Sequence, residues 1–270
     1  MTGSTTTLPV DFSHETPRAD ATDIALRATV EVDEITKSFA DKTVVANVSF
    51  SVRRGEFVAL LGPSGAGKTT LIRCMAGLEV PDAGTVRLDG ALLTSLARTE
   101  RRRVAVVFQQ FNLVSRLSAL DNVLAGRLGH VPTWRGMLRH FSRDDRLLAL
   151  ECLHRVGLID QAQQRADTLS GGQQQRVAIA RALAQQPEVI LADEPIASLD
   201  PQAARGILDL LRDICTRDRV AVVCCLHQLH FARDVADRIV GLAAGRLITD
   251  GPAVEFGDDA AARLYGASLT

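Results

Sequence analysis

The chain has 270 residues, of which 46% are hydrophobic, 23% charged and 4% aromatic. These ordinary values allow one domain with a large core, with or without a sizeable insertion. The net charge of −1 excludes a generally basic protein that binds nucleic acid through its overall charge, and no stretch approaches the roughly 18–20 consecutive apolar residues of a membrane span.

The first part of the chain changes character near residue 29. Residues 1 to about 27 are rich in Thr, Ser, Pro, Ala and Asp without apolar periodicity, so we expect residues 1–28 to form a disordered extension. Alternating patterns at 29–33 and 47–52 predict half-buried strands. A continuous apolar run at 56–61, which ends at Gly62, is typical of a buried parallel strand.

Strand and helix patterns alternate over most of the remaining chain. The predicted helices are 68–76, 170–185, 201–214 and 228–235. The predicted strands are 84–90, 103–108, 188–193, 219–226 and 238–242, followed by a hairpin arm at 245–250. This alternation predicts a parallel sheet with helices on both faces and a ligand beyond the carboxyl ends of its strands.

One segment, from about residue 112 to 167, lacks strand patterns. Leu-rich helical spacing at 120–128 and 144–156 predicts a helical insert there. Between these helices lies Trp134, the only tryptophan of the chain.

The five cysteines show no metal-ligand spacing and no CxxC pair. The adjacent Cys224 and Cys225 could form a redox sensor. We instead predict two core residues on a buried strand, because free cysteine is among the most buried residue types.

A glycine-rich loop follows the first buried strand. It reads Gly62-Pro63-Ser64-Gly65-Ala66-Gly67-Lys68-Thr69 and matches the phosphate-binding pattern GxxxxGK[ST]. A triphosphate needs several backbone N–H groups aimed at one place, in a loop too tight for most side chains. The following helix presents its positive end, Lys68 can reach the β- and γ-phosphates, and Thr69 can ligate Mg²⁺. A glycine-rich turn could match by chance, but the strand and helix around it favour a phosphate site.

Two acids end the apolar run at 189–192. We expect Asp193 to hold Mg²⁺ at the strand end and Glu194 to act as general base on the attacking water. Paired acids also occur in solvated turns. The phosphate loop favours the catalytic interpretation.

The segment 169–173 reads Leu-Ser-Gly-Gly-Gln and opens a predicted helix. Ser170 is a suitable N-cap, and the small residues leave the helix N-terminus free to meet an anion. An ordinary capped helix is the alternative, and physical chemistry alone does not say which anion it would meet.

Four motifs together carry a resemblance to ABC-transporter ATPases: GPSGAGKT at 62–69, LSGGQ at 169–173, ILADEP at 190–195 and SLD at 198–200. The chain resembles that family from about Thr29 to Tyr265. The resemblance implies an α/β fold, a P-loop NTPase (RecA-like) core with a parallel sheet, an N-terminal antiparallel β region and a helical insert subdomain. It also implies that residues 29–270 form one ABC ATPase domain, with the helical subdomain at about 112–167.

The resemblance implies a role for each matching residue. The catalytic residues would be Glu194, the switch histidine His227 and Gln109, which contacts the attacking water and senses the permease. Residues that would contact Mg²⁺ are Thr69, Gln109 and Asp193. Residues that would bind ATP are Phe39, Gly62, Pro63, Ser64, Gly65, Ala66, Gly67, Lys68, Thr69, Thr70, Ser170, Gly171, Gly172, Gln173 and Asp200. Phe39 would stack on adenine, although a phenylalanine there could also be a core residue, and Asp200 would couple two sites.

The resemblance further implies partners. A second copy of the chain would supply the LSGGQ segment to each ATP, and hydrolysis would drive integral-membrane permease subunits contacted by the insert near Gln109. A solute-binding protein would belong to the same system, nucleic acid would not be a partner, and the chain would lie peripherally on the cytoplasmic face of the inner membrane.

Within the family, the chain is most similar to ATPases of phosphonate importers. The similarity lies in 108–118, 122–129, 132–135, 166–168, 195–201 and 226–228. Cys224 and Cys225 depart from it, since relatives tend to have Val and Ser there. Uptake of phosphonate or a related phosphorus oxyanion is therefore expected. An importer for another solute, such as phosphate or an amino acid, and a non-transport ABC ATPase are the alternatives.

Overall fold

The computed structural model describes residues 28–97, 99–131 and 140–266. The predicted extension at 1–28 lies outside the described residues except for Ala28, which begins a strand, and Trp134 also lies outside them. No helix of the described part is long and apolar enough to cross a membrane.

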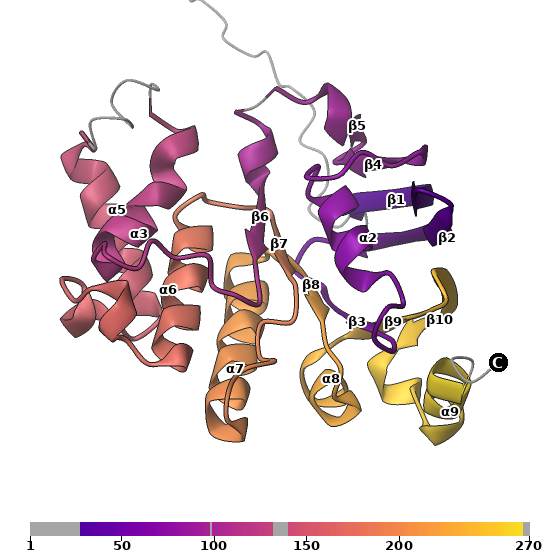
Figure 1. Ribbon diagram of the computed structural model, residues 1–270. Helices are drawn as coiled ribbons and strands as arrows, with labels where there is room; N and C mark the ends of the chain where they lie inside the picture. Colours follow the sequence, from indigo (N-terminus) through magenta and orange to yellow (C-terminus); the bar gives the residue numbers. More distant parts are fainter. Residues whose placement is uncertain (1–27, 98, 132–139, 267–270) are drawn as a thin grey trace, which may run out of the picture.

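The described chain forms two sheets (Figure 1). The antiparallel sheet has the order β2-β1-β4-β5 and consists of β1 (Ala28–Phe39), β2 (Lys42–Arg53), β4 (Ala83–Leu88) and β5 (Ala91–Leu92). The larger sheet has the order β10-β9-β3-β8-β7-β6. Its strands are β3 (Phe57–Leu61), β6 (Val104–Val107), β7 (Val189–Ala192), β8 (Ala221–Cys225), β9 (Arg238–Ala243) and β10 (Arg246–Pro252). All its pairings are parallel except that of β10 with β9.

Helices lie on both faces of the larger sheet, with α2 (Lys68–Met75) on one face and α6 (Gly171–Leu183), α7 (Pro201–Asp218) and α8 (Leu229–Val235) on the other. Helices α3 (Ala119–Leu124) and α5 (Arg143–Arg155) pack against α6, and α9 (Asp258–Gly266) packs against β9 and β10. The predicted alternation of strands and helices is therefore confirmed, with shifts of one to four residues at most ends. The sequence prediction missed β5 and α9.

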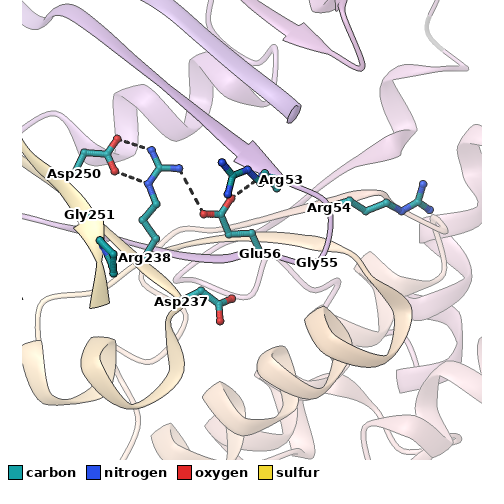
Figure 2. A pocket seen from close by; sticks show the side chains of 9 residues that line it. Arg53, Arg54, Gly55, Glu56, Asp237, Arg238, Asp250 and Gly251 are labelled. Carbon is teal, nitrogen blue, oxygen red and sulfur yellow. Dashed lines mark hydrogen bonds and ion pairs between the residues drawn. The ribbon is translucent and has the colours of Figure 1, made fainter. Parts of the chain in front are cut away.

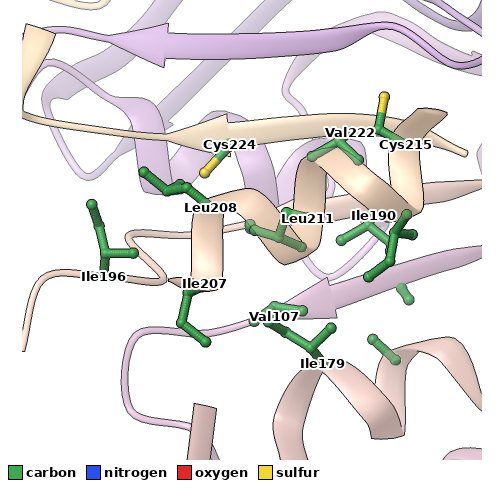
Figure 3. Packing of buried hydrophobic residues seen from close by; sticks show 14 of the residues in the cluster. Val107, Ile179, Ile190, Ile196, Ile207, Leu208, Leu211, Cys215, Val222 and Cys224 are labelled. Carbon is green, nitrogen blue, oxygen red and sulfur yellow. The ribbon is translucent and has the colours of Figure 1, made fainter. Parts of the chain in front are cut away.

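The parallel strands are apolar throughout because both faces of the sheet are buried. In β3, Phe57, Ala59 and Leu61 belong to a cluster that includes residues of α3, α5, α6 and α7. Val58 and Leu60, which point to the opposite face, belong to a second cluster with α2 and the antiparallel sheet. Figure 3 shows the first cluster where α6 and α7 meet the sheet.

The adjacent cysteines follow the same alternation. Cys224 lies in the first cluster and Cys225 in the second, and both are fully buried. The prediction of two core residues on a buried strand is confirmed. All five cysteines are free and buried.

The segment between β6 and α6 contains α3, α5 and short 3-10 helices, and its one bridge among the described residues joins Ser118 to Arg165. In Figure 1, α3 and α5 lie at the end of the molecule away from the antiparallel sheet. The carboxyl ends of β3, β7 and β8 lead into the residues that form the candidate site.

Candidate functional site

The loop at 62–69 joins β3 to α2 and requires glycine at two positions of close backbone approach. A Cβ atom on Gly62 would lie 2.1 Å from the Leu242 carbonyl oxygen, and one on Gly67 would lie 2.5 Å from the Val44 carbonyl oxygen. Both glycines also have positive φ, 150° and 100°. Backbone packing therefore holds the loop in a shape that only glycine permits.

Lys68 lies under this loop and is 5% exposed. Its Nζ atom donates to the carbonyl oxygens of Gly62, at 2.7 Å, and Pro63, at 3.1 Å. Burial lowers the pKa of Lys68, and it forms no ion pair with a carboxylate in the part of the chain that the structure describes. A buried cation held by carbonyl dipoles is well suited to receive an anion.

Asp193 directly follows β7 and contacts the phosphate loop. Its Oδ1 atom accepts a hydrogen bond of 3.1 Å from the Thr69 hydroxyl, and burial raises the pKa of Asp193. A hydroxyl and a buried carboxylate side by side supply the oxygen ligands that Mg²⁺ prefers, so these two residues fit that ion.

Glu194 and His227 form a close pair at the ends of neighbouring strands. The Nε2 atom of His227 lies 2.5 Å from Oε1 of Glu194. Glu194 has a φ of 51°, a left-handed conformation that is uncommon for residues other than glycine. Such strain concentrates at functional sites.

A cavity of about 200 Å³ lies over the loop and α2. Its lining consists of Val44, Ser64, Gly65, Ala66, Gly67, Lys68, Thr69, Thr70 and Glu194. Sites that enclose a whole drug-sized ligand usually measure about 300–1,000 Å³. This cavity therefore has room for phosphate groups, while the rest of a nucleotide would lie on the open surface. Val44 was missed from the sequence, where it lies between the two predicted strands at 29–33 and 47–52.

The LSGGQ segment caps α6. The Ser170 hydroxyl accepts from the Gln173 N–H at 3.3 Å, and the Gln173 side chain accepts from the Ser170 N–H at 2.9 Å. This reciprocal capping box explains why the helix begins here. Ser170 and Gly171 are exposed, and among the described residues the segment does not contribute to the cavity lining.

Three further predicted residues lie outside the cavity lining. Asp200 caps α7 by accepting from the N–H groups of Gln202 and Ala203, at 3.0 and 2.9 Å. Gln109 is exposed in the loop after β6. Phe39 is 48% exposed at the end of β1. The structure thus brings together the phosphate loop, Asp193, Glu194 and His227. It does not bring Phe39, Gln109, Asp200 or the LSGGQ segment into the cavity lining.

A larger depression of about 630 Å³ lies at the opposite end of β3 (Figure 2). Its acids are already paired: Asp250 and Glu56 with Arg238, and Asp237 with Arg212. The phosphate loop follows the other end of β3, so this depression is separate from the candidate site.

Comparison with known proteins gives a consistent result. Residues 45–197 match the family model described as ABC transporter. The hypophosphite import ATP-binding protein HtxD of Stutzerimonas stutzeri is 49% identical, over 90% of this chain and 71% of that protein. The phosphonates import ATP-binding protein PhnC of Thiobacillus denitrificans is 50% identical, over 87% of this chain and 92% of that protein.

Solved structures are also similar. A dimeric ATP-binding cassette in a post-hydrolysis state bound to ADP and Pi aligns with a TM-score of 0.72 and 36% identity, over 83% of this chain and 98% of that chain. A nucleotide-free cassette from an ABC transporter aligns with a TM-score of 0.75 and 26% identity, over 84% of this chain and 92% of that chain.

Proposed function

Because this chain belongs to the ABC transporter family of ATP-binding subunits, we propose that it hydrolyses ATP to drive uptake of a phosphonate or related phosphorus oxyanion. The observation that carries the ATPase assignment is the position of Glu194. Its carboxylate lies within 2.5 Å of His227 and lines the same cavity as Lys68 and Thr69. A base, a cation for phosphate and a ligand for Mg²⁺ therefore meet in one place.

The chemistry assigns a role to each of these groups. Backbone N–H groups of 62–69 and the Lys68 ammonium bind the β- and γ-phosphates. Thr69 and Asp193 would hold Mg²⁺, which neutralises charge on the phosphate oxygens. Glu194 accepts a proton from the attacking water, and His227 fixes the direction of the Glu194 carboxylate. Gln109 would contact the attacking water and the ion.

A second copy of the chain completes each site. The cavity has room for phosphate groups only, and the exposed N-terminus of α6 carries donors suited to an anion. Ser170, Gly171, Gly172 and Gln173 of one subunit would contact the γ-phosphate bound to the partner. The dimeric cassette among the similar structures supports this arrangement. Asp200, which caps α7, would lie between the two sites, and Phe39 would stack on adenine.

The helical subdomain, at about 112–167 within the ATPase domain 29–270, is proposed to contact the permease. It follows Gln109 directly and presents exposed apolar side chains at Val114, Leu128 and Leu147. Exposed apolar residues next to a catalytic loop suit a surface that passes movement to another protein. The chain would then work peripherally on the cytoplasmic face of the membrane, together with a solute-binding protein.

The proposed solute rests on the relatives. Proteins of two organisms, 49% and 50% identical to this chain, are named for hypophosphite and phosphonates import. This subunit would not contact the solute itself. Its similarity to the relatives therefore indicates a similar permease partner, and through that partner a similar solute.

The test is reconstitution in liposomes of the full chain with the permease and solute-binding protein that co-purify with it from native membranes. We expect ATP hydrolysis to rise on addition of a phosphonate or hypophosphite, and not on addition of an amino acid. Stimulation by an amino acid alone would contradict the proposed solute. Absence of any ATP hydrolysis would contradict the proposed enzyme activity.

A further inference from the structure

Arg181 lies in the third turn of α6 and reaches away from the helix to the loop that follows Gln109. Its NH1 atom donates to the carbonyl oxygen of Asn112 at 2.5 Å, and its NH2 atom donates to that of Phe111 at 2.8 Å. Among the described residues, no carboxylate forms an ion pair with this guanidinium. Burial lowers the pKa of Arg181. A charged side chain thus binds two consecutive backbone carbonyls.

The backbone that Arg181 holds is strained. Phe111 and Asn112 have φ values of 54° and 50°, in the left-handed region that non-glycine residues rarely adopt. The Asn112 N–H also closes a three-residue turn by donating to the Gln110 carbonyl oxygen. Two consecutive left-handed residues cost free energy, so this turn persists only while surrounding groups hold it.

A second clamp lies just beyond the turn. The side chain of Asn122, which is 1% exposed on α3, accepts from the Val114 N–H at 2.8 Å and donates to the Val114 carbonyl oxygen at 3.2 Å. The loop is therefore fixed to helices at residues 111–112 and at 114. Gln109 and Gln110 lie between this fixed part and β6, and both are exposed. The segment that joins the sheet to this fixed part is therefore Phe108, Gln109 and Gln110, so movement of α6 relative to the sheet would change the position of Gln109.

Helix α6 also carries the LSGGQ segment at its N-terminus. Its 13 residues form one continuous helix, whose backbone hydrogen bonds link the LSGGQ end to Arg181. Arg181 therefore ties two functional groups of the same subunit: the LSGGQ segment, which serves the partner's ATP, and Gln109, which serves its own.

Resting on the proposed function, we propose that Arg181 is a positioning residue that couples Gln109 to the LSGGQ helix. Engagement of one subunit's LSGGQ segment by ATP moves α6, and the Arg181 contacts carry that movement to Gln109 of the same subunit. Hydrolysis at the two sites is coupled through this contact.

The test is a double-mutant cycle on ATP hydrolysis by the full chain. Arg181→Met keeps the length of the side chain and removes its donors, and Gln109→Ala removes the group that Arg181 positions. We expect Arg181→Met to lower kcat about tenfold or more, because misplacement of a catalytic group by about 1 Å can cost that much. The KM for ATP should stay within about twofold, since the phosphate loop is untouched. In the Gln109→Ala background, Arg181→Met should lower kcat no further.

Arg176 provides the matched control. It lies on the same helix, and its NH1 atom donates to the Val156 carbonyl oxygen at 3.0 Å, away from the Gln109 loop. The effect of Arg176→Met, whatever its size, should multiply with that of Gln109→Ala. We also expect Arg181→Met to lower the Hill coefficient for ATP toward one. Arg181→Lys keeps one donor group, so its kcat and Hill coefficient should lie between those of Arg181→Met and the unsubstituted chain. If Arg181→Met fails to fold, the same double-mutant cycle with Arg181→Lys tests whether the effects of Arg181 and Gln109 are coupled.

Multiplying effects of Arg181→Met and Gln109→Ala would overturn the proposal, as would an unchanged kcat and Hill coefficient in Arg181→Met. Failure of the proposed function would look different. The unsubstituted chain itself would then not hydrolyse ATP, and Glu194→Gln would change nothing.

Discussion

The Nε2 atom of His227 lies 2.5 Å from Oε1 of Glu194 and joins the loop after β8 to the end of β7. A carboxylate can only accept, so the imidazole Nε2–H is the donor whenever Glu194 is ionised. This contact holds the Glu194 carboxylate in the wall of the cavity over the loop at 62–69.

Glu194→Gln tests the role of the base. The substitution preserves shape and removes the proton acceptor, so we expect kcat for ATP to fall by a factor of about 10²–10⁴. Binding of ATP, measured by a fluorescent nucleotide analogue, should change less than about twofold because Lys68 and the loop remain. A turnover rate equal to that of the unsubstituted chain would show that another group is the base.

Tyr265→Phe tests the support of His227. The Tyr265 hydroxyl of α9 donates to the His227 carbonyl oxygen at 3.2 Å, while its ring packs against the core. Removing the hydroxyl should cost about 0.5–1.5 kcal/mol of stability. It should also lower kcat by about twofold to fivefold without raising KM, because His227 is positioned less well. A loss of stability with unchanged kcat would limit Tyr265 to a structural role.

Two glycines of the phosphate loop form a matched pair. A Cβ atom on Gly67 would lie 2.5 Å from the Val44 carbonyl oxygen, whereas one on Gly65 would meet nothing within 4 Å. Gly65 has a φ of 78°, so Gly65→Ala should cost only about 1 kcal/mol of backbone strain. Gly67→Ala should also displace the loop and cost about 1–3 kcal/mol more stability than Gly65→Ala. Equal free energies of unfolding of the two variants, measured with urea in the absence of nucleotide, would contradict the close-packing argument.

The Arg103–Glu188 pair predicts a pH-dependent contribution to stability. The Arg103 Nε and NH2 atoms donate to the two Glu188 oxygens at 2.8 and 2.5 Å, and this contact lowers the pKa of Glu188. Because the folded pKa lies below the unfolded one, the stabilisation is complete above the ordinary glutamate pKa and is lost as pH falls through the folded value.

We therefore expect Glu188→Gln to lower the free energy of unfolding at pH 7 by about 1–2 kcal/mol. The difference from the unsubstituted chain should shrink below about pH 4. Urea unfolding at pH 7 and at a pH below about 4 measures this difference in stability. Glu151→Gln, at an exposed position, serves as the control. A difference that is constant with pH would rule out the ionic origin.

Much of the fold could be predicted because period-2 and period-3.6 patterns report burial directly. The apolar runs that became β3, β7 and β8 carry no polar residue, since both faces of the sheet are covered. Helix α9 was missed because Asp258 to Gly266 has only two buried side chains, Ala260 and Leu264. Such a short apolar face is too weak a signal on its own.

The candidate site also contains residues that could be predicted from the sequence and residues that could not. The phosphate loop was readable from sequence because its chemistry demands particular residues at fixed local spacing. Three residues were not found from the sequence. Val44 lines the cavity, Arg181 donates to the Asn112 carbonyl oxygen, and Tyr265 donates to the His227 carbonyl oxygen. Those contacts depend on tertiary packing and leave no local pattern.

Two copies of the chain are proposed to share each ATP, and ATP-driven dimerisation tests this sharing most directly. Molar mass of Glu194→Gln is measured by size exclusion with light scattering, with and without ATP and Mg²⁺, beside the double variant Glu194→Gln, Ser170→Arg. We predict that Glu194→Gln doubles its mass with ATP, whereas the double variant binds ATP equally well and remains a monomer, because the longer, charged side chain blocks the exposed start of α6. A double variant that dimerises as fully as Glu194→Gln, or a Glu194→Gln chain that binds ATP and stays monomeric, would contradict the shared site.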